Sequence, residues 1–161
     1  MRRCDPPILD ENGLPEAVRW YVTGLAKQSG LKIDLSISEG FGRLPRDTEL
    51  ALFRIVQESL TNVHRHSESK SAGIRLTREA QSINVEIEDE GKGIPAEKLI
   101  GIRAKGSGVG IAAMRERVRH LGGVMNIHSS NKGTKISVTF PASTSSIPEP
   151  HHTARPSIVT V

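Results

Sequence analysis

Residues 50–66, LALFRIVQESLTNVHRH, decide the fold because they predict the long helix against which the other segments pack. The apolar residues of this stretch recur three or four positions apart and form one stripe: Leu52, Ile55, Val56, Leu60 and Val63. The stretch is preceded by Pro45, Asp47 and Glu49. A proline followed by acidic residues in the first turn is typical of the start of a helix. The pattern predicts an amphipathic helix that ends at about His66.

The segments on both sides of this helix switch between helical and strand periods. Helical spacing covers residues 14–26 and 111–121, and strict alternation covers residues 31–37, 72–76, 83–87, 124–129 and 136–140. A glycine-rich stretch over residues 90–110 separates the second strand pair from the last helix. This order predicts an α+β domain, a two-layer α/β sandwich in which a sheet of about five strands carries helices on one face.

Length and composition limit the class of protein. The 161 residues suffice for one domain, which we expect over residues 14–141, after an N-terminal linker (1–13) and before a disordered tail (142–161). A single cysteine and the absence of a long apolar run indicate a cytoplasmic protein. The net charge of +4 is spread along the chain, so charge alone leaves a solvated surface, nucleic acid, a membrane surface and a polyphosphate ligand open.

The long helix carries the first group of candidate site residues. Glu58, Asn62, Arg65 and His66 are spaced i, i+4, i+7 and i+8, so one helix face would present all four. An Asn62 carbonyl oxygen suits Mg²⁺, Arg65 can neutralise phosphate, and Glu58 can orient or deprotonate a water or nucleophile. Taken alone, the spacing is more typical of a solvated helix face that is stabilised by i,i+4 pairs.

Two glycine-containing stretches give the other candidates. Residues 89–95, DEGKGIP, follow a strand, so Asp89 can accept a hydrogen bond from an amino group while Gly91 and Gly93 let a flat ligand such as adenine approach. Residues 106–110, GSGVG, precede a helix, and successive glycines there expose backbone amides to phosphate. Residues 89–95 are also compatible with an ordinary strand-ending turn. Residues 106–110 are also compatible with a flexible linker.

Together, the three stretches resemble the ATP-binding domain of sensor histidine kinases, within the gyrase, chaperone and mismatch-repair ATPase superfamily. Residues 57–67 look like the asparagine box of that family and residues 89–93 like its adenine-binding box. Residues 106–111, with the MRER segment at 114–117, look like its glycine lid, and Lys132-Gly133-Thr134 is similar to its last glycine-threonine element. The resemblance covers roughly residues 5–141.

The resemblance implies a Bergerat-type sandwich with a mixed sheet that binds ATP and Mg²⁺, with the metal on Asn62. Glu58 would be the catalytic residue that activates the acceptor histidine. Lys92 and Lys105 would add positive charge near the phosphates. The residues implied in ATP binding are Asn62, Arg65, His66, Asp89, Gly91, Gly93, Ile94, Gly106, Ser107, Gly108, Val109, Gly110, Ile111 and Thr134.

The same resemblance implies partners outside this chain. None of the six histidines precedes an Asp or Glu, as the phosphoacceptor of such kinases does, so we expect a catalytic fragment that binds Mg-ATP and cannot phosphorylate itself on histidine. The γ-phosphate would pass to a histidine of a dimerisation segment, in the parent protein or in a separate one. Residues 6–14, PPILDENGL, resemble the junction found in kinases whose response regulators are of the helix-turn-helix type. We expect no direct contact with nucleic acid or membrane by this chain, although the parent can be membrane-anchored.

Two other functions compete with a histidine kinase. A serine kinase of the anti-sigma-factor type would share the nucleotide site, but the junction at residues 6–14 argues against it. A basic nucleic-acid-binding module would use the net charge of +4, but the chain has no cluster of basic residues and only 3% aromatic residues.

Overall fold

One five-stranded sheet organises the molecule, with the strand order β1-β2-β3-β5-β4. The computed structural model describes residues 6–93 and 109–142, without the side chains of His66 and Val109. The strands are β1 (Lys32–Ile37), β2 (Ser71–Arg78), β3 (Ser82–Asp89), β4 (Val124–Ser130) and β5 (Gly133–Pro141). The β1–β2 pair is parallel and the other pairs are antiparallel, so the predicted mixed sheet is confirmed.

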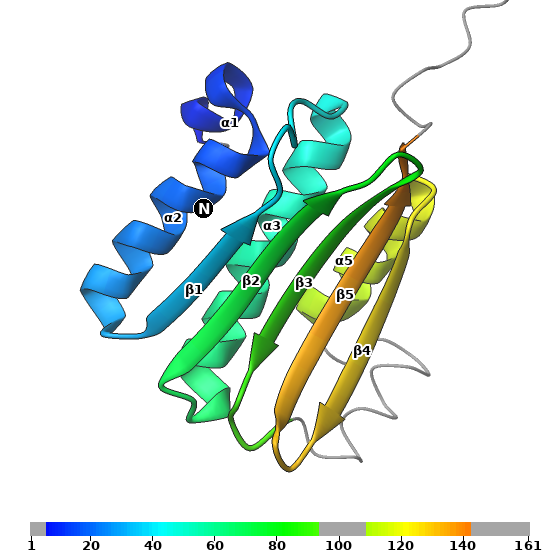
Figure 1. Ribbon diagram of the computed structural model, residues 1–161. Coiled ribbons are helices and arrows are strands. Elements are labelled where there is room, and N and C mark those ends of the chain that lie inside the picture. The colour runs from blue at the N-terminus through cyan, green and yellow to red at the C-terminus, as the bar shows by residue number, and fades with distance from the viewer. Residues whose placement is uncertain (1–5, 94–108, 143–161) are drawn as a thin grey trace, which may run out of the picture.

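Helices cover one face of the sheet, as Figure 1 shows. They are α2 (Leu14–Ser29), α3 (Arg46–Asn62) and α5 (Val109–His120). Since parallel strands cannot be joined by a hairpin, α3 provides the crossover between β1 and β2. The predicted α+β class and the two-layer sandwich are therefore confirmed. No helix in the described ranges is both long enough and apolar enough to cross a membrane.

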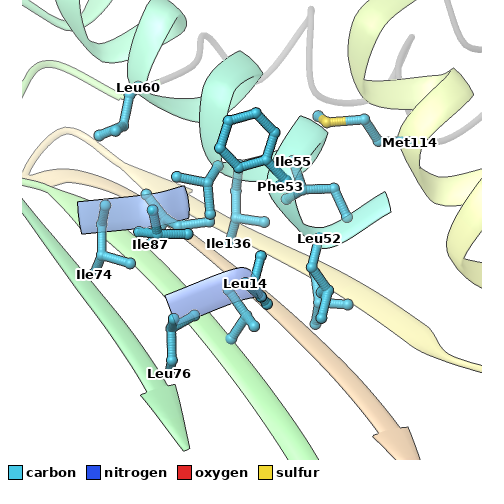
Figure 2. Packing of buried hydrophobic residues seen from close by; sticks show 14 of the residues in the cluster. Leu14, Leu52, Phe53, Ile55, Leu60, Ile74, Leu76, Ile87, Met114 and Ile136 are labelled. Atoms are coloured by element: carbon cyan, nitrogen blue, oxygen red, sulfur yellow. The ribbon is translucent and has the colours of Figure 1, made fainter. Parts of the chain in front are cut away.

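The core lies between the sheet and α3. Strands β2 and β3 bury every second residue, including Ile74, Leu76 and Ile87, because alternate side chains point to the helix-covered face. Phe53 of α3 is fully buried among them, and Met114 of α5 closes the neighbouring side (Figure 2). This packing fixes the position of α3 on the sheet and hence of the polar residues at its end.

The long helix changes its geometry where the sequence predicted it to continue. α3 is α-helical only as far as Asn62, and the chain continues as a π-helical segment, η1 (Val63–Ser67). A π-helix closes i to i+5 hydrogen bonds and turns less per residue than an α-helix. The predicted common face therefore holds for Glu58 and Asn62, but the α-helical spacing to Arg65 and His66 was wrong.

The predicted N-terminal linker was also wrong in part, because it contains a short helix, α1 (Pro7–Asn12). Leu9 is 2% exposed and packs in the core. Arg46 Nε donates to Asp10 Oδ1 at 3.0 Å, and Arg43 Nη2 donates to the Asp10 carbonyl oxygen at 3.1 Å. These contacts attach α1 to the start of α3.

Most of the predicted tail, residues 143–161, lies outside the described residues.

Candidate nucleotide-binding site

Four segments meet at one end of the sandwich (Figure 1). These are the η1–β2 turn, the end of β3 with residues 90–93, the β4–β5 hairpin, and the C-terminal part of α3 with the start of α5. Backbone and side-chain contacts join them pairwise, as described below. The described parts of the three stretches that the sequence singled out thus lie on elements that share this end.

Asp89 is the last residue of β3 and has the same parity as the buried Ile83, Val85 and Ile87. Its side chain therefore belongs to the helix-covered face of the sheet. Asp89 Oδ1 accepts a hydrogen bond from the Gly91 amide at 2.8 Å, and the Thr134 amide also donates to the carboxylate. Burial raises the pKa of this carboxyl above its ordinary value of 3.8, against the lowering effect of the two amides.

The β4–β5 hairpin packs tightly on the end of β3. A Cβ atom on Gly133 would lie 1.9 Å from the Asp89 carbonyl oxygen, and Gly133 has a φ of +136°, a conformation that side chains rarely adopt. The Thr134 hydroxyl lies 3.1 Å from the Ser129 hydroxyl across the hairpin. Glycine at this position therefore allows Thr134 to reach Asp89.

Gly91 and Gly93 are needed for packing against the protein itself. A Cβ on Gly91 would lie 2.1 Å from the Ser67 carbonyl oxygen, and one on Gly93 would lie 1.9 Å from the Ser130 carbonyl oxygen. The sequence predicted that these glycines would make room for a flat ligand. The contacts of both glycines in this structure are with backbone on either side, so the β3 end is held between η1 and the β4–β5 hairpin.

Serines of the η1–β2 turn complete this arrangement. The Lys92 amide donates to the Ser67 carbonyl oxygen at 2.9 Å, and the Glu90 amide donates to the Ser69 hydroxyl at 3.3 Å. Sequence reasoning did not assign either serine to the site. Ser67 acts through its backbone carbonyl, which leaves no signal in the residue type, but the Ser-x-Ser-x-Ser run at 67–71 is a pattern that favours such local turns.

Lys92 forms an ion pair with a carboxylate. Its Nζ lies 3.1 Å from Glu68 Oε1, and both side chains are exposed. Because the two charges compensate each other, Lys92 adds less positive potential than the sequence suggested. Lys105, the other lysine that was assigned to the phosphates, lies outside the described residues.

Glu58 of α3 lies against the first turn of α5. A Cβ on Gly110 would be 2.4 Å from Glu58 Oε1, so the carboxylate touches the backbone of that glycine. The positive end of the α5 dipole favours a negative charge there. The structure thus brings Glu58 and Gly110 together, and Asn62 follows one turn later on α3. Arg65 is exposed on η1, and Ile111 is 8% exposed in the core.

Several predicted residues cannot be placed by the structure. Ile94, Gly106, Ser107 and Gly108 lie outside the described residues, as do the side chains of His66 and Val109. Among the described residues, no group of three or more His, Cys, Asp or Glu side chains is arranged to hold a metal ion. Asn62 and Glu58 nonetheless offer an amide oxygen and a carboxylate, which are oxygen ligands of the type that Mg²⁺ takes together with phosphates and water.

The fold defines the class, a two-layer α/β sandwich with a mixed five-stranded sheet. The family described as "Histidine kinase-, DNA gyrase B-, and HSP90-like ATPase" matches residues 47–144. The chain belongs to this family. Its match covers α3, η1, all strands except β1, and α5.

Curated relatives narrow the kind of ATPase. The chain is 31% identical over 137 residues to the signal transduction histidine-protein kinase/phosphatase DegS of Brevibacillus brevis, a match over 84% of this chain and 34% of that protein. It is equally 31% identical over 137 residues to the sensor histidine kinase LiaS of Bacillus subtilis, over 84% of this chain and 36% of that protein. The chain thus spans about a third of the length of these two relatives, both of which are named as histidine kinases.

Solved structures agree on the fold. The histidine kinase domain of a blue-light activated histidine kinase from Erythrobacter litoralis superposes with a TM-score of 0.70, at 22% identity, over 82% of this chain and 62% of that one. The mycobacterial sensor histidine kinase MprB gives a TM-score of 0.58 at 20% identity, over 79% of this chain and 93% of that one. The sandwich is therefore a fold that this chain shares with these two structures.

Proposed function

We propose that this chain binds Mg-ATP at the β3 end and donates the γ-phosphate to a histidine on a dimerisation and phosphoacceptor segment, in two-component signal transduction. One observation carries the proposal. The Asp89 carboxylate faces the helix-covered side of the sheet and is fixed there by the amides of Gly91 and Thr134.

Asp89 would recognise adenine through its free acceptor capacity. A carboxylate can accept about four hydrogen bonds, and two are used by backbone amides. An exocyclic amine donates to such an oxygen, whereas guanine presents a carbonyl oxygen at the corresponding position and would be repelled. Gly93 and Thr134 would complete the base pocket together with Gly91 and Ile94.

Asn62 and Glu58 would act at the phosphate end. The Asn62 amide oxygen would hold Mg²⁺, which neutralises phosphate charge when bound. Glu58 would orient the acceptor imidazole or take its proton, and contact with Gly110 fixes where the carboxylate stands. Arg65, His66 and the glycine stretch Gly106, Ser107, Gly108, Val109 and Gly110 would surround the phosphates. Ile111 would contribute its backbone amide, because its side chain lies in the core. Catalysis would then depend mostly on positioning and charge neutralisation.

We also propose a signalling partner and a cellular location for this chain. The two relatives are named as a signal transduction histidine-protein kinase/phosphatase and a sensor histidine kinase, and a signalling kinase of this type would pass phosphate onward to a response regulator. We assign the regulator to the helix-turn-helix type because of residues 6–14, and the chain to the cytoplasm. DNA would then be contacted by the regulator and not by this chain.

A phosphotransfer experiment tests the proposed reaction. The chain is incubated with Mg²⁺, γ-labelled ATP and the dimerisation and phosphoacceptor segment of a sensor histidine kinase relative. We expect acid-labile, alkali-stable label on that segment. Glu58→Gln should reduce the label at least 10-fold while nucleotide affinity changes less than 3-fold, and Glu116→Gln, an exposed glutamate on α5, is the matched control.

Two results would contradict the proposal. Acid-stable label on a serine would favour the serine kinase alternative. Equal labelling by the Glu58→Gln and Glu116→Gln variants would remove Glu58 from the reaction and leave its contact with Gly110 as a packing role.

A further inference from the structure

The outer surface of α2 carries an apolar groove far from Asp89 in the fold. The groove has a volume of about 650 Å³. Its lining comes from α2 and from Ile8 of α1, and includes Trp20, Tyr21, Gly24, Leu25 and Lys27. Trp20 is 58% exposed, which is unusual for so large an apolar side chain. The nucleotide site described above makes no use of this surface.

Successive ridges of α2 shape the groove. Residues at i+4 spacing form ridges on a helix, and here Trp20, Gly24 and Gln28 form one such ridge. Tyr21 and Leu25 form the next ridge inward and pack against the core. Because Gly24 has no side chain, the outer ridge is interrupted one turn after Trp20.

The Gly24 position has no explanation within the domain. A glycine in the interior of a helix is less favourable than alanine. A Cβ added at Gly24 would meet nothing within 4 Å, so no neighbour in the described residues requires its absence. The remaining explanation is that a partner molecule packs closely against α2 at Gly24, beside the exposed Trp20.

The charge at the rim of the groove selects the kind of partner. Glu16 is ion-paired with Arg19 one turn away, so these two charges compensate. Lys27, at the other end of the groove, forms no ion pair with the described residues and leaves the rim positive. The chain as a whole is also positive, at +4. An acidic partner is thus favoured by both local and net charge.

We propose that this groove docks an amphipathic helix of a partner protein, with acidic residues beside its apolar stripe. Trp20 would pack on the apolar stripe, and a ridge of the partner helix would cross α2 at the Gly24 gap. Lys27 would face an acidic side chain of the partner. This inference is independent of the proposed kinase function, since it uses no residue of the nucleotide site.

Trp20 makes the proposal measurable, because it is the only tryptophan of the chain. The probe is an 18-residue peptide designed as an amphipathic helix, with a leucine stripe flanked by glutamates. We expect a saturable blue shift of the Trp20 emission on titration. A peptide with the same leucine stripe and lysine flanks should bind at least 5-fold more weakly, and Lys27→Glu should reverse that order.

A substitution at Gly24 separates docking from folding. Gly24→Leu should weaken peptide binding at least 5-fold while the unfolding temperature stays equal or rises, because leucine fills the gap and favours the helix. Glu116→Leu, at an exposed position of α5 and outside the groove, should leave binding unchanged. Absence of a saturable shift, equal binding of both peptides, or a shift produced only by anionic lipid vesicles or DNA would each overturn the proposal.

Discussion

Asp89 combines three properties that the proposed chemistry needs at the scale of a single residue. It lies at the end of a buried strand, it faces the helix layer, and it is anchored by the amides of Gly91 and Thr134. An anchored acceptor binds a donor without first losing side-chain freedom. Strand parity thus turns a common strand-ending aspartate into a candidate base-recognition group.

The titration of Asp89 should report nucleotide binding. Burial raises its pKa above 3.8, so between that value and the folded pKa the free energy of unfolding falls as pH rises. A hydrogen bond from the adenine amine favours the charged form of the Asp89 carboxyl, so bound ADP should lower the pKa of Asp89 in the folded protein. By the same linkage, ADP should bind more tightly once Asp89 is ionised. Carboxyl ¹³C NMR with and without saturating ADP measures this. A midpoint that ADP does not move would argue against contact between the base and Asp89, and the signal of Asp34 on the opposite face of the sheet serves as control.

The contact between Gly91 and Ser67 gives a second prediction at this scale. Gly91→Ala should lower the free energy of unfolding by about 2 kcal/mol, because its Cβ would lie 2.1 Å from the Ser67 carbonyl oxygen and the loop must shift. Gly24→Ala, which meets nothing within 4 Å, should raise it by about 0.5 to 1 kcal/mol. Urea unfolding followed by circular dichroism measures both. Equal stability of the two variants would contradict the packing described for Gly91.

At the scale of elements, α1 and α3 are joined by charged groups of unequal burial. Glu49 is 1% exposed, and its Oε1 accepts from Arg43 Nε at 3.0 Å and from the Leu44 amide at 2.8 Å. Arg43 also packs on Gly13 between α1 and α2. The pair between Asp10 and Arg46 is more exposed. The buried carboxylate is therefore the group that organises this junction.

Removing the two carboxylates should have different consequences. Glu49→Ala should cost about 2 kcal/mol of unfolding free energy, because the buried Leu44 amide loses its acceptor. Asp10→Ala removes an exposed pair and should cost about 0.5 kcal/mol or less. Thermal unfolding of both variants measures the difference, and a larger loss for Asp10→Ala would contradict this account of the junction.

Helices and strands were predictable from the sequence where they were long enough to show a hydrophobic period. The stripe on residues 52–63 and the alternation in β2 and β3 predicted elements that the structure confirms, because each spans several repeats of its period. α1 was missed since its six residues contain too few apolar positions to show a period. The π-helical segment that begins at Val63 was missed because its residues continue the helical apolar spacing, so the sequence pattern does not distinguish it from an α-helix.

At the scale of the whole molecule, the site is assembled by topology. The register of β3 with β5 pairs Glu88 with Lys135 and so brings the hairpin residue Thr134 beside Asp89. Sequence motifs predicted which stretches carry the chemistry, but the individual site residues remain predictions. Steric roles such as that of Gly133 depend on the partner backbone, so residue type alone cannot distinguish ligand contact from internal packing.

The groove on α2 and the nucleotide site lie on separate parts of the molecule, yet one aromatic contact connects their helices. Tyr21 of α2 meets Phe53 of α3 edge to face, with ring centroids 5.9 Å apart. Phe53 lies on the same helix as Glu58 and Asn62. The α2 groove and the proposed nucleotide site thus involve helices of the same layer.

The central claim is that this sandwich binds adenine nucleotide at Asp89 with a metal at Asn62. The most direct measurement is titration of a fluorescent ATP analogue, with and without Mg²⁺, against the wild type and the Asp89→Asn, Asn62→Asp and Asp34→Asn variants. We expect at least a 10-fold loss of affinity for Asp89→Asn, a changed Mg²⁺ dependence for Asn62→Asp, and no change for Asp34→Asn. Affinity that is unchanged in both the Asp89 and Asn62 variants would contradict it.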